Sequence, residues 1–201
     1  MSLGFSLGGC RFTIGFSCLA LGTACCLFAG LENGGWLLLA MLLHEGGHLL
    51  ALGVFRAPPR QVALSALGCR MELDPRKPLG WGQGAAVSLA GPGANLLAFG
   101  LLSLGGLGGH AFALANVGLG LLHSLPIPPL DGGLALGSLL RWRLGEERAG
   151  RWGAALAALF LFPLAAVGFL VLLRTRYNFS LLALSVYLML YLVLKGEVPA
   201  P

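Results

Sequence analysis

Three ionisable side chains interrupt an apolar run that is otherwise long enough to cross a membrane. Residues 36–55 read WLLLAMLLHEGGHLLALGVF and are apolar apart from His44, Glu45 and His48. A helix of about twenty residues is needed to span the hydrocarbon core of a bilayer. A charged side chain at that depth costs about 2.5–3.5 kcal/mol on insertion scales, so these three groups need a compensating partner. The sequence therefore predicts a membrane helix that carries a functional polar cluster.

The composition agrees with a membrane protein. The chain has 201 residues, of which 57% are hydrophobic and 10% are charged, whereas about 25% of residues are charged in soluble domains. An all-α polytopic membrane protein is the expected fold class. The net charge of +5 comes from Lys and Arg in loops, so it bears on membrane orientation, and no nucleic-acid partner is expected. The five cysteines lack C-x-x-C spacing, which favours packing roles over a zinc–thiolate site or disulfides.

The hydropathy pattern predicts a single membrane-embedded domain, 1–201, with six spans. We expect the first span to be a retained helix rather than a cleaved signal peptide. The charged segment 137–152 is expected to be an interfacial loop. All Lys and Arg other than Arg174 and Arg176 then fall on the side that holds both termini, and the positive-inside rule predicts that this side is cytosolic. The six spans are expected at about 12–30, 36–55, 84–107, 111–127, 153–173 and 179–194.

The polar segment between the second and third spans predicts a small β-hairpin. Val62, Leu64 and Ala66 alternate with polar or small residues, and the phase of the alternation shifts after Gly68. Two short strands joined near Gly68 would have this pattern. Such a hairpin could offer an edge that holds an extended substrate peptide as an added strand. The alternative is an amphipathic interfacial loop.

The histidines of the second span have the spacing of a metal site. His44 and His48 are four residues apart, so on a helix their imidazoles share one face. H-E-x-x-H on a helix is a zinc-hydrolase signature in which the two histidines bind the metal and the glutamate, here Glu45, takes a proton from water. The alternative is a coincidental pair that lines a polar seam between helices.

Two further polar residues occur in apolar surroundings where helices are weakened. Asp131 follows three prolines in four positions and precedes Gly132 and Gly133. Because two histidines leave a zinc site incomplete, Asp131 is the expected third ligand; the alternative is an ordinary turn aspartate. Asn95, three residues after Pro92 in the third span, requires a hydrogen-bond partner at membrane depth.

These motifs together resemble the site-2 protease family of intramembrane zinc metalloproteases. The segment His44–His48 matches its H-E-x-x-H motif, and Leu125–Gly133 is similar to its proline-rich L-D-G motif. Gly91–Asn95 is similar to the G-P-x-x-N often found between the two. The compact layout is most similar to the stage IV sporulation protein FB branch. The resemblance implies one Zn²⁺ per chain, held by His44, His48 and Asp131, with Glu45 as the catalytic acid and base.

The resemblance also implies partners and a location. The expected substrate is a membrane-associated protein, which in this branch is a sporulation sigma-factor precursor. The resemblance also allows an inhibitory membrane partner and an oligomeric state. The expected location is a bacterial cell membrane or a spore-compartment membrane. One departure stands out, since the family usually has asparagine eight residues before the motif aspartate, where this chain has His123. His123 is expected to donate a hydrogen bond to substrate or oxyanion, with Asn95 as the other candidate, or to compete as a metal ligand.

Three other functions remain open from the sequence. A prenyl-protein type of zinc protease also contains H-E-x-x-H but takes its third ligand from a later glutamate, here Glu146, Glu147 or Glu197. A metal transporter or a non-catalytic membrane scaffold could use the same metal site without hydrolysis. The expected function is nevertheless hydrolysis of a peptide bond in or next to a membrane-associated segment of a protein.

Overall fold

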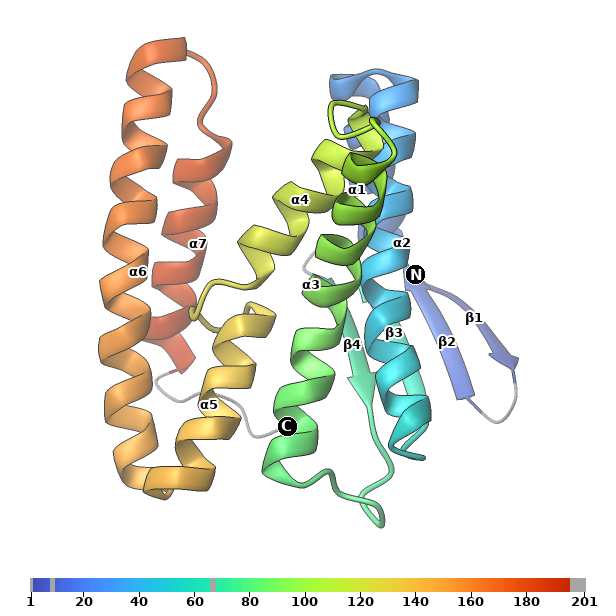
Figure 1. Ribbon diagram of the computed structural model, residues 1–201, viewed down its shortest axis with the longest axis vertical. Coiled ribbons are helices and arrows are strands. Elements are labelled where there is room, and N and C mark those ends of the chain that lie inside the picture. Colours follow the sequence, from blue (N-terminus) through green and yellow to red (C-terminus); the bar gives the residue numbers. More distant parts are fainter. Residues whose placement is uncertain (1, 8–9, 66–67, 196–201) are drawn as a thin grey trace. The chain divides into compact units, whose positions relative to one another are not determined.

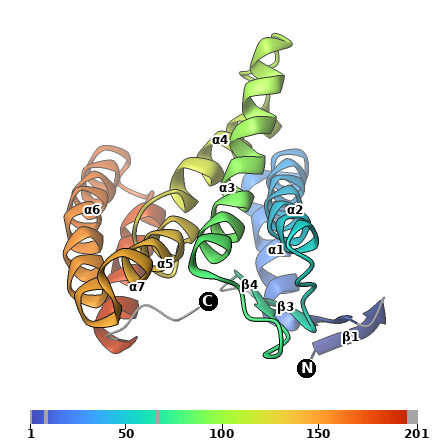
Figure 2. The same ribbon diagram turned by 60° about the horizontal axis from the view of Figure 1, so that its bottom comes forward.

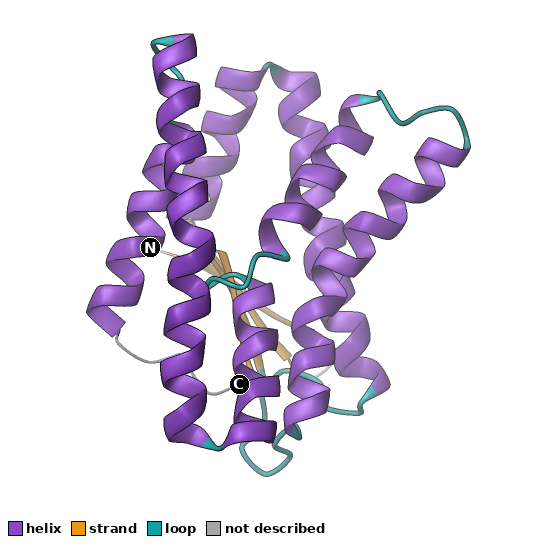
Figure 3. Cartoon of the chain, turned by 60° about the vertical axis from the view of Figure 1, so that its left-hand side comes forward, coloured by secondary structure: helices purple, strands orange, loops and turns teal. Residues whose placement is uncertain are grey.

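The computed structural model describes residues 2–7, 10–65 and 68–195 of the chain (Figure 1). Within these ranges it is mostly helical, with only a small sheet, as the colouring of Figure 3 shows. The described strands are β1 (Ser2–Leu7), β2 (Cys10–Gly15), β3 (Gln61–Ser65) and β4 (Gly68–Glu72). The described helices are α1 (Phe16–Ala29), α2 (Leu31–Val54), α3 (Trp81–Leu104), α4 (Ala111–His123), α5 (Asp131–Leu144), α6 (Glu146–Thr175) and α7 (Ser180–Lys195).

The chain divides into two compact units. The first unit contains Met1–Leu79 and Ala90–Leu121, and so includes the sheet, α1, α2 and most of α3 and α4. The second unit contains Gly80–Leu89 and Leu122–Pro201, and so includes the start of α3 and helices α5 to α7.

Three of the described helices are long and apolar enough to cross a membrane. They are α2, α3 and α6, and each overlaps one of the predicted spans. The other three predicted spans correspond to α1, α4 and α7, which are apolar but have only 14, 13 and 16 residues. At 1.5 Å per residue such helices are about 20–24 Å long, which is less than the ~30 Å of the hydrocarbon core.

Several predicted boundaries differ from the structure: α3 ends at Leu104 rather than 107, α4 ends at His123 rather than 127, and two further differences concern α1 and the segment 137–152. The first span was expected to begin at residue 12, but β2 continues to Gly15 and α1 begins at Phe16. Residues Arg11 to Ile14 pair with β3, and this long-range pairing prevails over local hydropathy. The segment 137–152 was expected to be a loop, but α5 and α6 occupy all of it except Gly145, which has φ of 77°. The charged side chains there lie on helices, where Arg141 Nε donates to Glu146 Oε2 at 2.9 Å.

The predicted hairpin is confirmed, but it belongs to a larger sheet. β3 and β4 are antiparallel, with Leu64 opposite Cys69, and Gly68 begins β4 with φ of 113°. The sheet has the order β1-β2-β3-β4, in which β2 and β3 are parallel and β1 and β2 are antiparallel. β1 and β2 were not predicted, and the pairing of β2 with β3 joins residues about fifty positions apart in the sequence.

This strand order limits where a substrate strand could add to the hairpin. Val62 and Leu64 lie on β3, which has β2 on one side and β4 on the other, so their backbone groups have no vacant edge to offer. Ala66 lies outside the described residues. Within the predicted segment, β4 is the strand at an edge of the described sheet.

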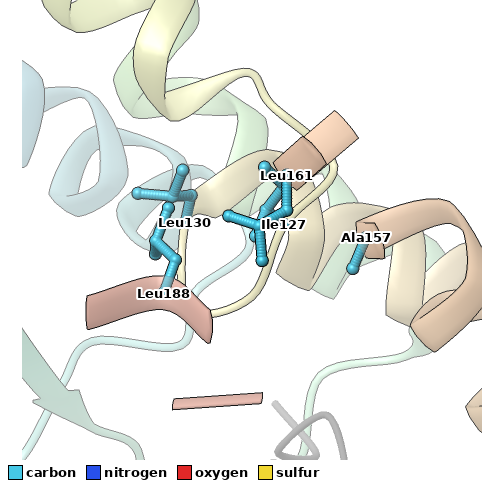
Figure 4. Packing of buried hydrophobic residues seen from close by; sticks show 5 residues of the cluster. All are labelled: Ile127, Leu130, Ala157, Leu161 and Leu188. Carbon is cyan, nitrogen blue, oxygen red and sulfur yellow. The ribbon is translucent and has the colours of Figure 1, made fainter. Parts of the chain in front are cut away.

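Apolar packing in the second unit fixes the proline-rich segment that precedes α5. Ile127 and Leu130 of this segment are buried against Ala157 and Leu161 of α6 and Leu188 of α7 (Figure 4). Helices α6 and α7 run side by side (Figure 2). The segment that leads to Asp131 is therefore held by a packed apolar cluster, although three prolines prevent it from forming a regular helix.

The distribution of side chains on α2 fits a membrane protein. Leu42 and Leu50 are 64% and 72% exposed, whereas His44 and His48 are 4% and 8% exposed. A soluble helix would bury its leucines and expose its ionisable groups. An apolar exterior with polar groups turned inward is the arrangement that lipid favours.

Candidate metal centre

The two histidines of α2 form a closely spaced pair of buried imidazoles. Their rings are 4.9 Å apart between centroids and nearly perpendicular, and the two Nε2 atoms are 3.3 Å apart. Two nitrogen ligands at 2.0–2.1 Å from a tetrahedral zinc ion are themselves separated by about 3.3–3.4 Å. The pair therefore fits one zinc ion held through Nε2 of His44 and Nε2 of His48. The same separation also suits a hydrogen bond between the rings.

The G-P-x-x-N segment of α3 supports both imidazoles. A Cβ atom added at Gly91 would overlap Nε2, Cε1 and Cδ2 of the His48 ring, so only glycine leaves room for this imidazole. One turn further along α3, Asn95 Oδ1 lies 2.6 Å from His44 Nδ1. The Asn95 contact leaves His44 Nε2 on the side that faces Nε2 of His48.

Helices α2 and α3 approach closely because small residues meet at their interface. A Cβ atom added at Gly47 would lie 2.5 Å from the carbonyl oxygen of Ala90, whereas one added at Gly46 would meet nothing within 4 Å. Glycine at such a contact lets membrane helices pack backbone to backbone. This contact brings Asn95 of α3 within hydrogen-bonding distance of α2.

Asn116 of α4 is a buried residue of this centre that the sequence analysis missed. It is 0% exposed, as is Asn95, and its Oδ1 accepts a hydrogen bond of 2.7 Å from Asn95 Nδ2. Its own Nδ2 donates to the Phe112 carbonyl at 2.8 Å. An amide inside an apolar span was the available signal, since such a group needs a partner at membrane depth.

Glu45 follows His44 in the sequence, and in space it lies near strand β4. The Cys69 thiol of β4 lies near the Glu45 side chain and interacts with it. Burial and, secondly, the charge of Glu45 raise the pKa of Cys69 well above its usual range. The thiol therefore stays protonated near neutral pH and can act as a donor to the carboxylate. The edge strand β4 passes beside the predicted catalytic carboxylate.

In the second unit, Asp131 and His123 form a second polar pair. His123 is the last residue of α4 and Asp131 is the first of α5, and His123 Nδ1 lies 2.7 Å from Asp131 Oδ2. A carboxylate at a helix N-terminus is stabilised by the helix dipole. With one oxygen engaged by imidazole, Asp131 is oriented as ligating carboxylates usually are.

The paired glycines after Asp131 allow the chain to fold back over the start of α5. A Cβ atom at Gly132 would overlap the Ser124 carbonyl, and one at Gly133 would overlap the backbone nitrogen of Pro128. Any larger residue at either position would push the proline-rich segment away from α5. These contacts explain why glycine follows Asp131 twice, which a simple turn would not require.

The described residues include a His/His/Asp group that could bind a metal ion. Its members are His44, His123 and Asp131. His44 and Asp131 are predicted ligands. The third member is His123, whereas the sequence predicts His48 as the third ligand.

Comparisons with known proteins give a likeness of fold. No protein-family model matches the sequence, and no curated protein matches it. Among solved structures, the site-2 protease from Methanocaldococcus jannaschii matches with a TM-score of 0.65 and 18% sequence identity. The match covers 100% of this chain and 98% of the other. The chain therefore shares its fold with a site-2 protease.

Proposed function

We propose that this protein is an intramembrane zinc metalloprotease, which hydrolyses a peptide bond in or next to a membrane-associated segment of a protein substrate. The observation that carries the proposal is the buried His44–His48 pair, whose Nε2 atoms have the separation expected of two ligands of one zinc ion. The fold shared with a site-2 protease and the neighbouring Glu45 support it.

The proposed ligands are His44, His48 and Asp131, with one zinc ion per chain. In this assignment His123 donates from Nδ1 to Asp131 Oδ2. That hydrogen bond orients the carboxylate as a ligand. His123 as the second imidazole, in place of His48, is the competing assignment.

The chemistry follows from the positions of the chain's own groups. Zinc, when bound, polarises the scissile carbonyl and lowers the pKa of water from 15.7 to about 7. Glu45 follows His44 on α2 and receives the proton of the attacking water, then returns it to the leaving amine. Apolar surroundings strengthen these interactions because little bulk water screens them. Water reaches the site beside the broken helix at Pro126–Gly133 and the polar segment 56–82.

We further propose that an unwound substrate adds to the edge of β4. A helical substrate hides its amides, so it must become extended before hydrolysis, and an edge strand can hold it in that form. β4 is suited to this because its Cys69 interacts with Glu45, so the edge lies near the proposed base.

Proline replacements along β4 test this substrate position. Proline removes a backbone donor without adding bulk to the site. Arg70→Pro and Met71→Pro, on adjacent residues of β4, remove donors on opposite sides of the strand. We expect the variant that affects the outer edge to slow cleavage of a single-span reporter protein by about 10-fold or more. Unchanged cleavage by both variants, each folded as judged by its melting temperature, would exclude strand addition.

The family branch, its substrate and the membrane topology are also proposals. The compact motif layout supports the stage IV sporulation protein FB branch and, with it, a sigma-factor precursor as substrate; failure to cleave such a precursor would remove this assignment. The Lys and Arg distribution supports six spans with cytosolic termini. Labelling of the 174–178 turn from the cytosolic side would contradict that orientation.

The structure disfavours the prenyl-protein type of protease. Its third ligand would be a later glutamate, but Glu146 is paired with Arg141 and its side chain is 69% exposed. Glu147 is paired with Arg151 and its side chain is 91% exposed. Glu197 lies outside the described residues. Surface ion pairs of this kind are poor sources for a buried metal ligand.

Metal removal tests the proposed function. Purified protein in detergent or lipid is expected to contain one zinc ion per chain and to cleave a single-span reporter. A strong chelator should abolish both the zinc content and the cleavage, and added zinc should restore both. Protein that contains zinc but cleaves no reporter would favour a scaffold or transporter, and protein that cleaves equally well without metal would refute a metalloprotease.

A further inference from the structure

Every polar atom of the Asn95 side chain is engaged by protein groups. Nδ2 donates to the Ala40 carbonyl at 3.0 Å and to Asn116 Oδ1 at 2.7 Å, while Oδ1 lies 2.6 Å from His44 Nδ1. Both amide hydrogens are therefore used within the protein. This arrangement favours a structural role for Asn95 toward His44 over the substrate-binding role considered from the sequence.

Two backbone carbonyls fix the direction of the hydrogen bonds among His44, Asn95 and Asn116. The Phe112 carbonyl can only accept, so it orients the Asn116 amide with Nδ2 toward Phe112 and Oδ1 toward Asn95. The Ala40 carbonyl can only accept as well, so Asn95 must also present Nδ2 on that side. Reversing the Asn95 amide would set its oxygen against two other oxygens. Asn95 Oδ1 is consequently the atom that faces His44.

An amide oxygen opposite His44 decides where the imidazole carries its proton. Because Asn95 Oδ1 can only accept, His44 Nδ1 must be the donor. In a neutral imidazole with hydrogen on Nδ1, the lone pair that can bind a metal is on Nε2. Nε2 is also the atom that lies 3.3 Å from Nε2 of His48.

We infer that Asn95 and Asn116 are positioning residues that hold His44 as the Nδ1–H tautomer, so that Nε2 is the atom offered to a metal ion. The metal part of this inference rests on the proposed function, whereas the tautomer does not. Asn95 acts on His44 directly. Asn116 acts on it through Asn95, by keeping the Asn95 amide from reversing.

The hydrogen bonds that orient His44 connect three helices. His44, Asn95 and Asn116 lie on α2, α3 and α4, and the asparagines are fully buried. Buried amides that are fully hydrogen-bonded hold their elements in one arrangement, and loss of one partner leaves an unpaired polar group. Partners of metal-binding histidines typically change metal affinity by about 10-fold to 100-fold when they are removed.

Ring-nitrogen NMR of metal-free protein labelled with ¹⁵N-histidine tests the inference. Spectra are recorded at about pH 8, above the ordinary histidine pKa of about 6.5, and zinc affinity is measured separately by competition with a chelator. The unaltered protein should show His44 protonated at Nδ1. In Asn95→Leu and Asn116→Leu the Nδ1–H population should fall, and zinc affinity should fall by about 10-fold or more.

Two further variants separate the hydrogen-bond role from simple damage to the fold. Asn116→Asp, whose carboxyl when protonated donates to the Phe112 carbonyl and keeps an acceptor oxygen for Asn95, should restore both the tautomer and the zinc affinity. Ser185→Ala removes a buried hydroxyl that bonds only to Leu181 of its own helix in the described contacts, and it should change neither.

The tautomer also separates this inference from the proposed function. His44 protonated at Nε2 in the unaltered metal-free protein would overturn the inference, even if no leucine variant folds. An unchanged tautomer in both folded leucine variants would overturn it as well. If the protein binds no zinc and cleaves nothing, the proposed function fails, while an Nδ1–H tautomer that depends on Asn116 still upholds the inference.

Discussion

Protein that carries Glu45→Gln is expected to keep its zinc and to lose at least about 100-fold of its cleavage rate, since general acid–base catalysis contributes about 10²–10⁴-fold. Glutamine has nearly the same shape as glutamate but cannot accept a proton from water. His44 and His48 are unchanged in this variant, so the metal site itself should persist. Zinc content and reporter cleavage, measured on the same preparation, give the two quantities.

Glu32→Gln is the matched control for this variant. Glu32 lies in the first turn of the same helix and is exposed, so the same loss of charge there should leave cleavage unchanged. Cleavage by Glu45→Gln at the unaltered rate would rule out Glu45 as the base. Loss of zinc together with cleavage would instead mean that Glu45 supports the metal site.

Replacement of Gly91 by alanine is expected to lower zinc affinity by about 100-fold or more, because it displaces a ligand rather than only a partner of a ligand. The added Cβ atom would lie 2.7 Å from Cε1 and 2.8 Å from Cδ2 of His48. The His48 ring must then rotate or α3 must move away from α2. Either change alters the 3.3 Å separation of the two Nε2 atoms. Competition with a chelator measures the affinity.

Gly93→Ala is the control for the effect of alanine on α3. A Cβ atom at Gly93 would meet nothing within 4 Å, and alanine favours a helix over glycine by about 1 kcal/mol. Gly93→Ala should therefore keep its zinc affinity and be as stable as the unaltered protein or slightly more so. Equal zinc affinities in Gly91→Ala and Gly93→Ala would contradict the placement of His48 against Gly91.

The parts of the fold that the sequence predicts are those with a local cause. The i, i+4 spacing of His44 and His48 places them on one face of any helix, and the alternation around Gly68 is enough to predict β3 and β4. The pairing of β2 with β3 has no local cause, because it joins residues about fifty positions apart. The α5 helix was missed because its arginines and serine lower its hydropathy, which conceals a regular helix that begins at Asp131.

The same distinction applies to the candidate site. The ligand types follow from the motifs, but the reason for Gly91 is visible only when α3 lies against His48. The partner of Asn116 could not be assigned from sequence, because Asn95 is 21 residues away on another helix. The asparagines that contact His44 depend on packing between helices, whereas the His44–His48 spacing lies within one helix.

The central claim is that Asp131 binds the same ion as the two imidazoles of α2. Zinc K-edge X-ray absorption of an Asp131→Cys variant tests it, because a thiolate ligand lies at about 2.3 Å and nitrogen or oxygen ligands at about 2.0–2.2 Å. We expect the unaltered protein to show two imidazoles and no sulfur, and the variant to show two imidazoles and one sulfur. Zinc that remains bound in the variant with no sulfur neighbour would contradict the account.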